Sequence, residues 1–192
     1  MPDYHPFEIY CAYHEAGHAV AQIYYFGRGL KAVTLPRFET NNPFEGYKAR
    51  NIITLPGDFG RDAAGVERHL LVVLAGAAAA DRWAVDNGVK ISNRGDQNDR
   101  AWAAGLLWTA CEAGVNIGNN SLPRLERRIA ALFQRPKVWA AVVKTTEPLL
   151  ELREIRGDVL TCHVKLELGR LLTEAEVALL AAAAGRAADR PR

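Results

Sequence analysis

The segment from Gly60 to Asn87 constrains the fold of this chain more than any other feature. Its apolar residues recur at helical spacing and predict a long helix; they include Val66, Leu70, Val73, Leu74, Ala77 and Ala78. The stretch from Phe7 to Phe26 contains no proline, and with Pro6 in the first turn it predicts another long helix that Gly27 or Gly29 ends. The chain is therefore expected to be mostly α-helical.

A small β element is expected between these two helices. The stretch "LKAVTLPRF" (residues 30–38) and the stretch "ARNIITLP" (residues 49–56) each predict a short strand, and the polar segment between them predicts a turn. The fold class that follows is mostly α with a small β element.

Four further helices are predicted after residue 90. They run from about Asp96 to Ala113, from Ser121 or Pro123 to Phe133, from about Pro136 to Glu154 with Gly157 marking the end, and through "VALLAAAA" in the tail. Thr173 and Glu176 form a capping-box pattern ahead of that last helix. The final residues "DRPR" are expected to be frayed.

Composition narrows the classes of protein that fit. The chain has 192 residues, 49% of them hydrophobic, so it can bury a core as one domain without metal or disulfide staples. Its formal net charge of +2 gives no reason to expect nucleic acid as a partner. Cys11, Cys111 and Cys162 are widely spaced and odd in number, which favours a reducing compartment over a disulfide framework.

No membrane or export segment is expected. The first ten residues lack the basic start and apolar stretch of a signal peptide. The longest apolar run, Leu70 to Ala80, is too short to cross a bilayer. These features predict a cytoplasmic protein.

The stretch "AYHEAGHAVA" (residues 12–21) carries the chemistry. In a helix, His14 and His18 lie one turn apart on the same face, so both imidazoles can face one metal ion. Glu15 is rotated by about 100° and can reach a metal-bound water without ligating the metal. This H-E-x-x-H arrangement is typical of zinc peptidases in which the glutamate is the general base. Two histidines with a carboxylate favour zinc, although such a set also admits iron or cobalt.

Zinc needs a third protein ligand, because catalytic sites keep the fourth position open. Cys11 is a poor choice, since it lies about 10 Å from His18 along the helix axis, and a buried thiol explains it better. His69 fits a partly exposed structural histidine, and His5 and His163 have no motif around them. The remaining candidates are acidic, and spacing alone does not choose among them: Glu67, Asp81, Asp86, Asp96 and Asp99.

The same stretch resembles the zinc motif of the FtsH family of membrane-anchored, ATP-dependent metalloproteases. The resemblance continues through "KAVTLPR", "VVLAGAAAADRW", "RGDQNDRAWAAGL" and "EPLLELREIRGDVL", in that order, over most of residues 10–160. It implies an FtsH-like helical zinc-peptidase domain at residues 1–160, with residues 161–192 as a C-terminal helical extension.

The resemblance also implies the third ligand. The family's Gly-Ala-Ser-Asn-Asp helix start matches Gly95, Asn98 and Asp99, which makes Asp99 the metal-binding carboxylate. Asp96 is then free to cap the helix, a role that its position supports independently. The alternative is Asp96 as ligand, with Asp99 in the first turn facing the helix dipole.

The chain departs from the family in lacking a G-x-x-x-x-G-K-[S/T] phosphate loop and a membrane segment. The expected function is therefore a zinc-dependent endopeptidase that acts without ATP on unfolded or flexible polypeptides, with or without a separate ATPase or adaptor partner. The strand through Val33, Thr34 and Leu35 is predicted to bind the substrate as an added strand, or else to be an internal strand of the sheet. The family implies rings of six, but its ATPase part contributes to them, so the oligomeric state stays open.

Three other readings compete with a stand-alone peptidase. One is a zinc-binding adaptor or interaction module with little turnover, although such a module has no need of Glu15. Another is a regulatory metalloprotease that clips a repressor, for which no helix-turn-helix is found. The last is a fold relic without metal.

Overall fold

The computed structural model describes residues 4–35, 50–53, 62–90, 96–117 and 121–188. This part of the chain is mostly helical with one small sheet, as the sequence predicted. The elements in chain order are α1 (Pro6–Phe26), β1 (Leu30–Thr34), β2 (Arg50–Ile53), α2 (Ala63–Asp86), α3 (Asp96–Glu112), α4 (Leu122–Phe133), α5 (Pro136–Leu152), β3 (Glu154–Arg156), α6 (Gly157–Glu167) and α7 (Glu174–Ala188).

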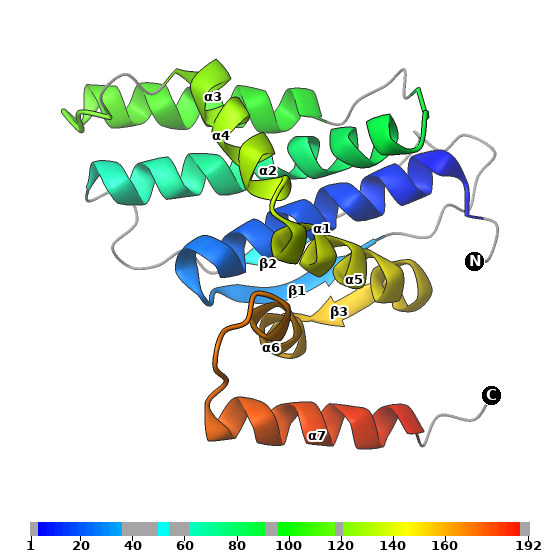
Figure 1. The fold of residues 1–192 in the computed structure, drawn as a ribbon. Coiled ribbons are helices and arrows are strands. Elements are labelled where there is room, and N and C mark those ends of the chain that lie inside the picture. Colours follow the sequence, from blue (N-terminus) through cyan, green and yellow to red (C-terminus); the bar gives the residue numbers. More distant parts are fainter. Residues whose placement is uncertain (1–3, 36–49, 54–61, 91–95, 118–120, 189–192) are drawn as a thin grey trace.

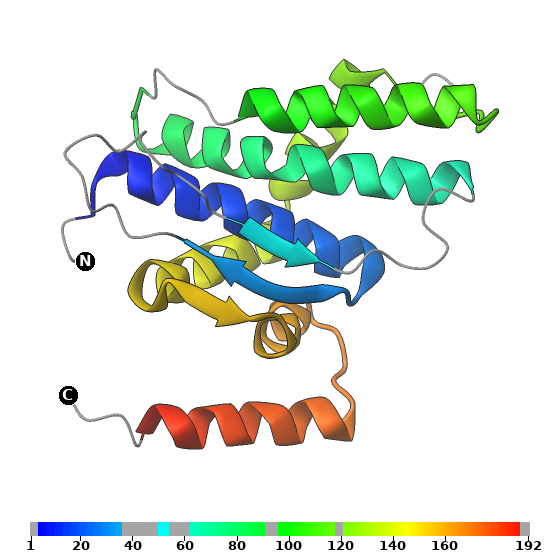
Figure 2. The same ribbon diagram turned by 180° about the vertical axis from the view of Figure 1, so that it is seen from behind.

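The helices α3, α2 and α1 form successive layers, and the sheet lies against α1 on the side away from α2 (Figures 1 and 2). The helices α4 and α5 complete the body, with α4 packed on α2 and α5 packed on α1. The middle helices α1 and α2 therefore supply much of the core, which is why Val20, Ile23, Leu70 and Leu71 are almost completely buried.

The ends of α1 show why its residues form a helix. The Nδ1 atom of His5 accepts a hydrogen bond from the backbone N–H of Phe7, and Pro6 occupies the first turn. Gly27 ends the helix in the left-handed conformation, at a φ of 69°. In the middle of α1, a Cβ atom on Gly17 would lie 2.6 Å from the carbonyl oxygen of Ala75. The two layers can approach this closely because glycine stands there.

The strand order β2-β1-β3 places β1 in the centre of the sheet. Both neighbours are antiparallel to it, and Ala32, Val33 and Thr34 pair with residues on each side. The backbone N–H of Leu35 also donates to the carbonyl of Arg153, at 2.7 Å.

The prediction that Val33, Thr34 and Leu35 bind an added substrate strand is therefore wrong. A substrate strand needs a free edge, and β1 is paired on both sides at Val33 and Thr34. The side chains of Val33 and Leu35 are buried in the core. The alternative from the sequence, an internal strand, is what the structure has.

The role predicted for Gly157 is also wrong. The helix α5 ends at Leu152, Arg153 caps it in the left-handed conformation, and Gly157 begins α6 after the short strand β3. A Cβ atom on Gly157 would lie 2.0 Å from the carbonyl oxygen of Leu30, so close packing on β1 explains this glycine. The predicted domain boundary at residue 160 falls inside α6, which packs on β1, α1 and α5 as part of the body.

The element that stands apart is α7. It lies away from the body in both views, and its main contacts in the described chain are with α6 (Figures 1 and 2). Its predicted capping box is confirmed, because the backbone N–H of Thr173 donates to Glu176 at 2.9 Å and the N–H of Glu176 donates back to Thr173 at 3.3 Å. The predicted fraying of residues 189–192 lies outside the described residues.

One described helix, α2, is long and apolar enough to cross a membrane by length and composition alone. Of its most apolar window, 67% is buried inside this structure. The layers α1, α3 and α4 cover it. In this fold α2 is a core helix.

Candidate metal centre

Two helices bring three potential metal ligands together. His14 and His18 extend from one face of α1, and Asp99 extends from the first turn of α3. The Nε2 atoms of the two histidines are 3.1 Å apart, and the Oδ2 atom of Asp99 lies 3.1 Å from His14 Nε2 and 3.2 Å from His18 Nε2. The three atoms form a nearly equilateral triangle.

The size of this triangle suits a tetrahedral zinc ion. With bonds of about 2.0 Å, tetrahedral geometry separates any two ligand atoms by about 3.3 Å. The distances of 3.1 to 3.2 Å observed here are close to that edge length. Three protein ligands would occupy one face of the tetrahedron and leave the fourth position open, as in catalytic zinc sites.

A hydrogen bond fixes the orientation of His18. Its Nδ1 atom lies 2.8 Å from the backbone carbonyl oxygen of Val72 in α2. The carbonyl can only accept, so Nδ1 carries the proton and donates, and in the neutral ring the lone pair is on Nε2. Metal-binding histidines usually have such a partner on the second nitrogen. The buried Nδ1 atom of His14 has no hydrogen-bond partner among the described residues.

Gly76 of α2 forms the floor of the centre. A Cβ atom at this position would lie 2.4 Å from the Nε2 atom of His18 and 2.7 Å from the Nε2 atom of His14. Both distances are far below van der Waals contact, so any side chain here would displace the two imidazoles. Gly76 therefore leaves space for the ligands.

His18 and Asp99 strongly affect each other's protonation in the metal-free chain. Burial alone would lower the pKa of His18, but its hydrogen bond to Asp99 and the charge of that carboxylate raise the pKa to about 9. Burial alone would raise the pKa of Asp99, but hydrogen bonds from His14 and His18 hold it well below its usual range. Without a metal, protonated His18 and the carboxylate of Asp99 therefore form an ion pair at neutral pH.

The centre is accessible to solvent. The side chains of His14, His18 and Asp99 are 12%, 15% and 21% exposed. The partial exposure of all three ligands fits an open coordination site better than a closed structural one. Glu15 is 5% exposed, and its charge raises the pKa of His18.

Other residues considered from the sequence have different environments. Cys11 is a buried thiol, as predicted. His69 is 1% exposed, so the prediction of a partly exposed histidine is wrong; its ring packs edge-on against Trp102, and burial lowers its pKa to about 4. Glu67 is in an ion pair with Arg128.

Asp81 and Asp86 lie outside the metal cluster. Asp81 accepts a hydrogen bond from the Tyr10 hydroxyl at 3.3 Å, and Asp86 pairs with Arg82 at 3.3 Å. Asp96 is the first residue of α3, and its side chain lies outside the described residues. Of the acidic candidates from the sequence, the structure brings Asp99 to the two histidines.

Sequence reasoning missed two contributors to the centre, Val72 and Gly76. The Val72 carbonyl belongs to the backbone, so no residue type could have revealed it. Gly76 did leave a signal, because it stands among alanines inside a helix, where glycine costs about 1 kcal/mol relative to alanine. Such a residue indicates close approach of another group.

The sequence matches no protein-family model and no curated protein.

Proposed function

We propose that the protein is a zinc-dependent endopeptidase, with His14, His18 and Asp99 as metal ligands and Glu15 as general base. The observation that carries the proposal is the triangle of ligand atoms, whose edges suit a tetrahedral zinc ion and which leaves one coordination position open. Glu15 follows the first ligand directly in the chain. A site that only bound metal would not need this carboxylate.

Each group in the proposed site has a separate role in peptide hydrolysis. Zinc, when bound, supplies a Lewis acid that polarises the scissile carbonyl and lowers the pKa of water. Glu15 takes a proton from the attacking water and passes it to the leaving amine. The Val72 carbonyl holds the ring of His18 in the tautomer that ligates through Nε2. Gly76 keeps the space in which both imidazoles lie.

We infer that the chain is an FtsH-like peptidase domain, on the sequence motifs and on the order of the elements that carry them. On its own the domain is proposed to act without ATP on unfolded or flexible polypeptides, or on substrates that a separate ATPase or adaptor partner delivers. We further propose that it works in the cytoplasm, because its three widely spaced cysteines fit a reducing compartment.

The test is cleavage of an unfolded protein by the zinc-loaded chain and by its Glu15→Gln variant. Both proteins are expected to bind zinc, because Glu15 is not a ligand in the proposal. Loss of the general base is expected to lower kcat by about 100-fold or more. Asp158→Asn, which removes an exposed charge far from the centre in the sequence, is the matched control and is expected to cleave like the parent.

The outcomes separate the rival functions. Cleavage by the parent and the control, with little from Glu15→Gln, supports the endopeptidase. No cleavage by zinc-loaded parent or variant on any unfolded substrate contradicts it and favours a zinc-binding adaptor. Equal cleavage by parent and Glu15→Gln contradicts the role of Glu15.

A further inference from the structure

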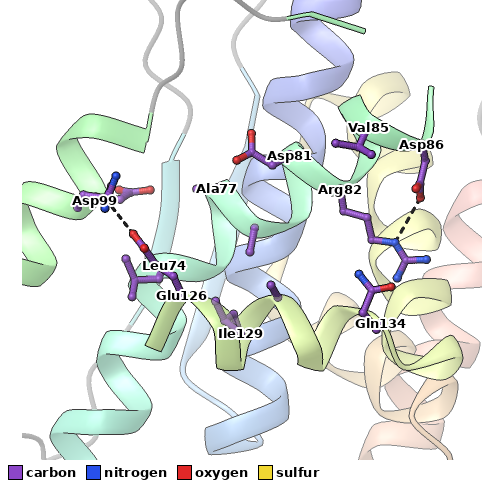
Figure 3. A pocket seen from close by; sticks show the side chains of 13 residues that line it. Leu74, Ala77, Asp81, Arg82, Val85, Asp86, Asp99, Glu126, Ile129 and Gln134 are labelled. Carbon is purple, nitrogen blue, oxygen red and sulfur yellow. Dashed lines mark hydrogen bonds and ion pairs between the residues drawn. The ribbon is translucent and has the colours of Figure 1, made fainter. Parts of the chain in front are cut away.

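The cations of the pocket beside the metal centre are paired. This pocket, of about 440 Å³, lies between α2, α3 and α4 and has Asp99 in its wall. Arg82 pairs with Asp86 at 3.3 Å, as Figure 3 shows, and Arg100 pairs with Glu126 at 2.8 Å. Each positive charge at this pocket therefore has a negative partner within the chain.

A different group of cations surrounds Tyr24, in the last turn of α1. The guanidinium of Arg135 donates to the Tyr24 hydroxyl at 2.8 Å, and the guanidinium of Arg170 lies over the Tyr24 ring, 5.5 Å from its centroid. The Nζ atom of Lys137 lies beside Gly169, where it would be 3.2 Å from an added Cβ atom. Together Tyr24, Arg135, Lys137 and Arg170 form the Tyr24 cluster, and its three cations are exposed.

The end of α1 explains one of these cations. No basic residue lies in the last turn of this helix, and Arg170 donates to the carbonyl oxygens of Ile23 and Tyr24 at 3.1 and 2.8 Å. These contacts satisfy open carbonyls and place a positive charge at the negative end of the helix dipole. Among the described residues, neither Arg135 nor Lys137 donates to a carbonyl of α1, so helix capping does not account for them.

The positive charge of the Tyr24 cluster is not compensated within the described part of the chain. None of its three cations pairs with a carboxylate there, and Glu167, three residues before Arg170, pairs instead with Lys144 at 2.6 Å. The formal net charge of the whole chain is only +2. The cluster is therefore a local concentration of positive charge on a surface that is close to neutral.

The chemistry of the cluster suits carboxylates. A guanidinium can bind a carboxylate through two parallel hydrogen bonds, and such charge-assisted bonds are about twice as strong as neutral ones. Because Arg135 and Arg170 contact the same tyrosine, both charges act on a segment of only a few residues. A compact site of this kind fits a short run of Asp or Glu side chains, whereas a nucleic acid requires a basic stripe along the surface.

We propose that the Tyr24 cluster is a docking site for an acidic segment of the polypeptide substrate, away from the scissile bond. The inference rests on the proposed peptidase function and adds a feature by which substrates are selected. Tyr24 lies six residues beyond His18 on the same helix, about 9 Å along its axis. An extended chain covers about 3.3 Å per residue, so a substrate of roughly ten residues can reach both places.

Binding tests the docking site separately from turnover. Three fluorescent probes are titrated at low ionic strength with the zinc-loaded Glu15→Gln chain, which retains the cluster without cleaving. One is a glycine-serine peptide with three glutamates, one has glutamines in their place, and one is a tetranucleotide with the same three negative charges. The acidic peptide is expected to bind about tenfold more tightly than either of the others, and added salt is expected to reduce its advantage over the glutamine peptide.

A double variant removes the two cations that helix capping does not explain. Arg135→Gln with Lys137→Gln, in the Glu15→Gln chain, is expected to abolish the preference for the acidic peptide while zinc binding persists. Both residues are exposed, so the variant is expected to fold. The matched control, Arg124→Gln with Lys90→Gln, removes one arginine and one lysine charge at exposed positions, in the first turn of α4 and beyond the end of α2. It is expected to keep the preference.

Cleavage then shows whether the acidic segment belongs to the substrate. The parent chain is given two unfolded substrates that differ only in three glutamates or three glutamines away from the cleaved bond. Because docking raises the local concentration of the substrate, KM is expected to be about tenfold lower for the acidic substrate, with kcat unchanged. Arg135→Gln with Lys137→Gln is expected to raise that KM to the value of the glutamine substrate.

Each result has a distinct meaning. A preference that needs the intact cluster, together with the lower KM, supports the docking site. Equal binding of the two peptides, a preference that survives the double variant, or tighter binding of the tetranucleotide overturns it. Equal KM values for the two substrates overturn the assignment of the segment to the substrate. If binding depends on the cluster but the parent cleaves neither substrate, the site for an acidic segment stands and the proposed peptidase function fails.

Discussion

Gly76 shows how a single missing side chain can make a metal centre. The backbone of α2 approaches the Nε2 atoms of both histidines so closely that a Cβ atom would lie 2.4 and 2.7 Å from them. The position is unusual in a helix rich in alanine, and the helix accepts the lower propensity of glycine there. The space for the ligands is thus supplied by a helix that contributes no ligand.

We therefore expect Gly76→Ala to weaken zinc binding by at least about tenfold, comparable to the loss of a supporting residue at other metal sites. The physical reason is displacement of the imidazoles of His14 and His18. The measurement is zinc affinity by competition with a coloured chelator. The control is Gly105→Ala, where a Cβ atom would meet nothing within 4 Å and alanine favours the helix. Unchanged affinity in Gly76→Ala would contradict the described geometry.

Protonation of His18 predicts how zinc binding depends on pH. Its pKa in the folded, metal-free chain is raised from 6.5 to about 9, so the ion pair with Asp99 stabilises the fold fully below pH 6.5 and is lost as pH rises through about 9. The pKa of Asp99 is depressed, so its contribution is present above its ordinary value of 3.8 and is lost only in strong acid.

Zinc must displace the proton on His18, so its affinity is expected to rise with pH by about tenfold per unit between about pH 7 and 9. The measurement is a chelator-competition titration at several pH values, with proton release followed in parallel. An affinity that did not change over this range would contradict the proton held on His18 in the metal-free chain.

At the scale of elements, the junction of β3 and α6 packs closely on the sheet. A Cβ atom on Gly157 would lie 2.0 Å from the Leu30 carbonyl oxygen and 2.7 Å from the carbonyl carbon of Lys31. These are backbone atoms of the central strand, which is paired on both sides and cannot move away cheaply.

Gly157→Ala is therefore expected to lower the free energy of unfolding by about 3 kcal/mol, at the upper end for overpacked sites. The measurement is denaturant unfolding monitored by circular dichroism. Gly114→Ala serves as a comparison. A Cβ atom on Gly114 would meet nothing within 4 Å, so the loss of stability in that variant comes from the positive φ of 74° and not from a steric clash. A loss in Gly157→Ala below about 1 kcal/mol would contradict close packing of α6 on β1.

The sequence predicted the helices and strands themselves better than it predicted which of them pack against each other. Helical spacing, Pro6 and Gly27 placed α1 and α2 within a few residues, and the Thr173–Glu176 pattern identified the start of α7. These signals are local, so a sequence can reveal them. The partners of β1 and the role of Gly157 depend on which segments meet in space, and there the local signal was misleading.

The same division holds for the candidate site. The spacing of His14 and His18 on one helix already placed two imidazoles on one face. Spacing alone did not choose among the acidic residues, and the resemblance of the helix start around Gly95, Asn98 and Asp99 was what indicated Asp99. The structure brings that carboxylate to the two histidines through the packing of α3 on α2. The pocket also depends on that packing, because its walls come from three helices.

At the scale of the whole molecule, α7 lies beyond α6 and away from α1 and α3, the two helices that carry the metal-ligand residues (Figure 1). The main contacts of α7 in the described chain are with α6, and Val177 on its surface is 55% exposed. The body therefore does not depend on α7 for its core.

Removal of residues 173–192 is expected to leave zinc affinity within about twofold of the parent, because tolerance to truncation follows from low burial of the removed segment. The cut keeps Arg170, whose side chain donates to the carbonyl oxygens of Ile23 and Tyr24. The ion pair between Lys165 and Glu176 is lost, so a small decrease in melting temperature is expected. Loss of zinc binding or of the folded state would show that α7 supports the body.

The metal centre itself is tested most directly by zinc affinity in a matched pair of variants, Asp99→Asn and Asp96→Asn. Each removes one carboxylate charge from the first turn of α3, so the two differ in position but not in chemistry. The parent and Asp96→Asn are expected to bind a single zinc ion with similar affinity, and Asp99→Asn is expected to bind it at least about 100-fold more weakly. No zinc binding by the parent, or a loss in Asp96→Asn rather than in Asp99→Asn, would contradict a centre formed by His14, His18 and Asp99.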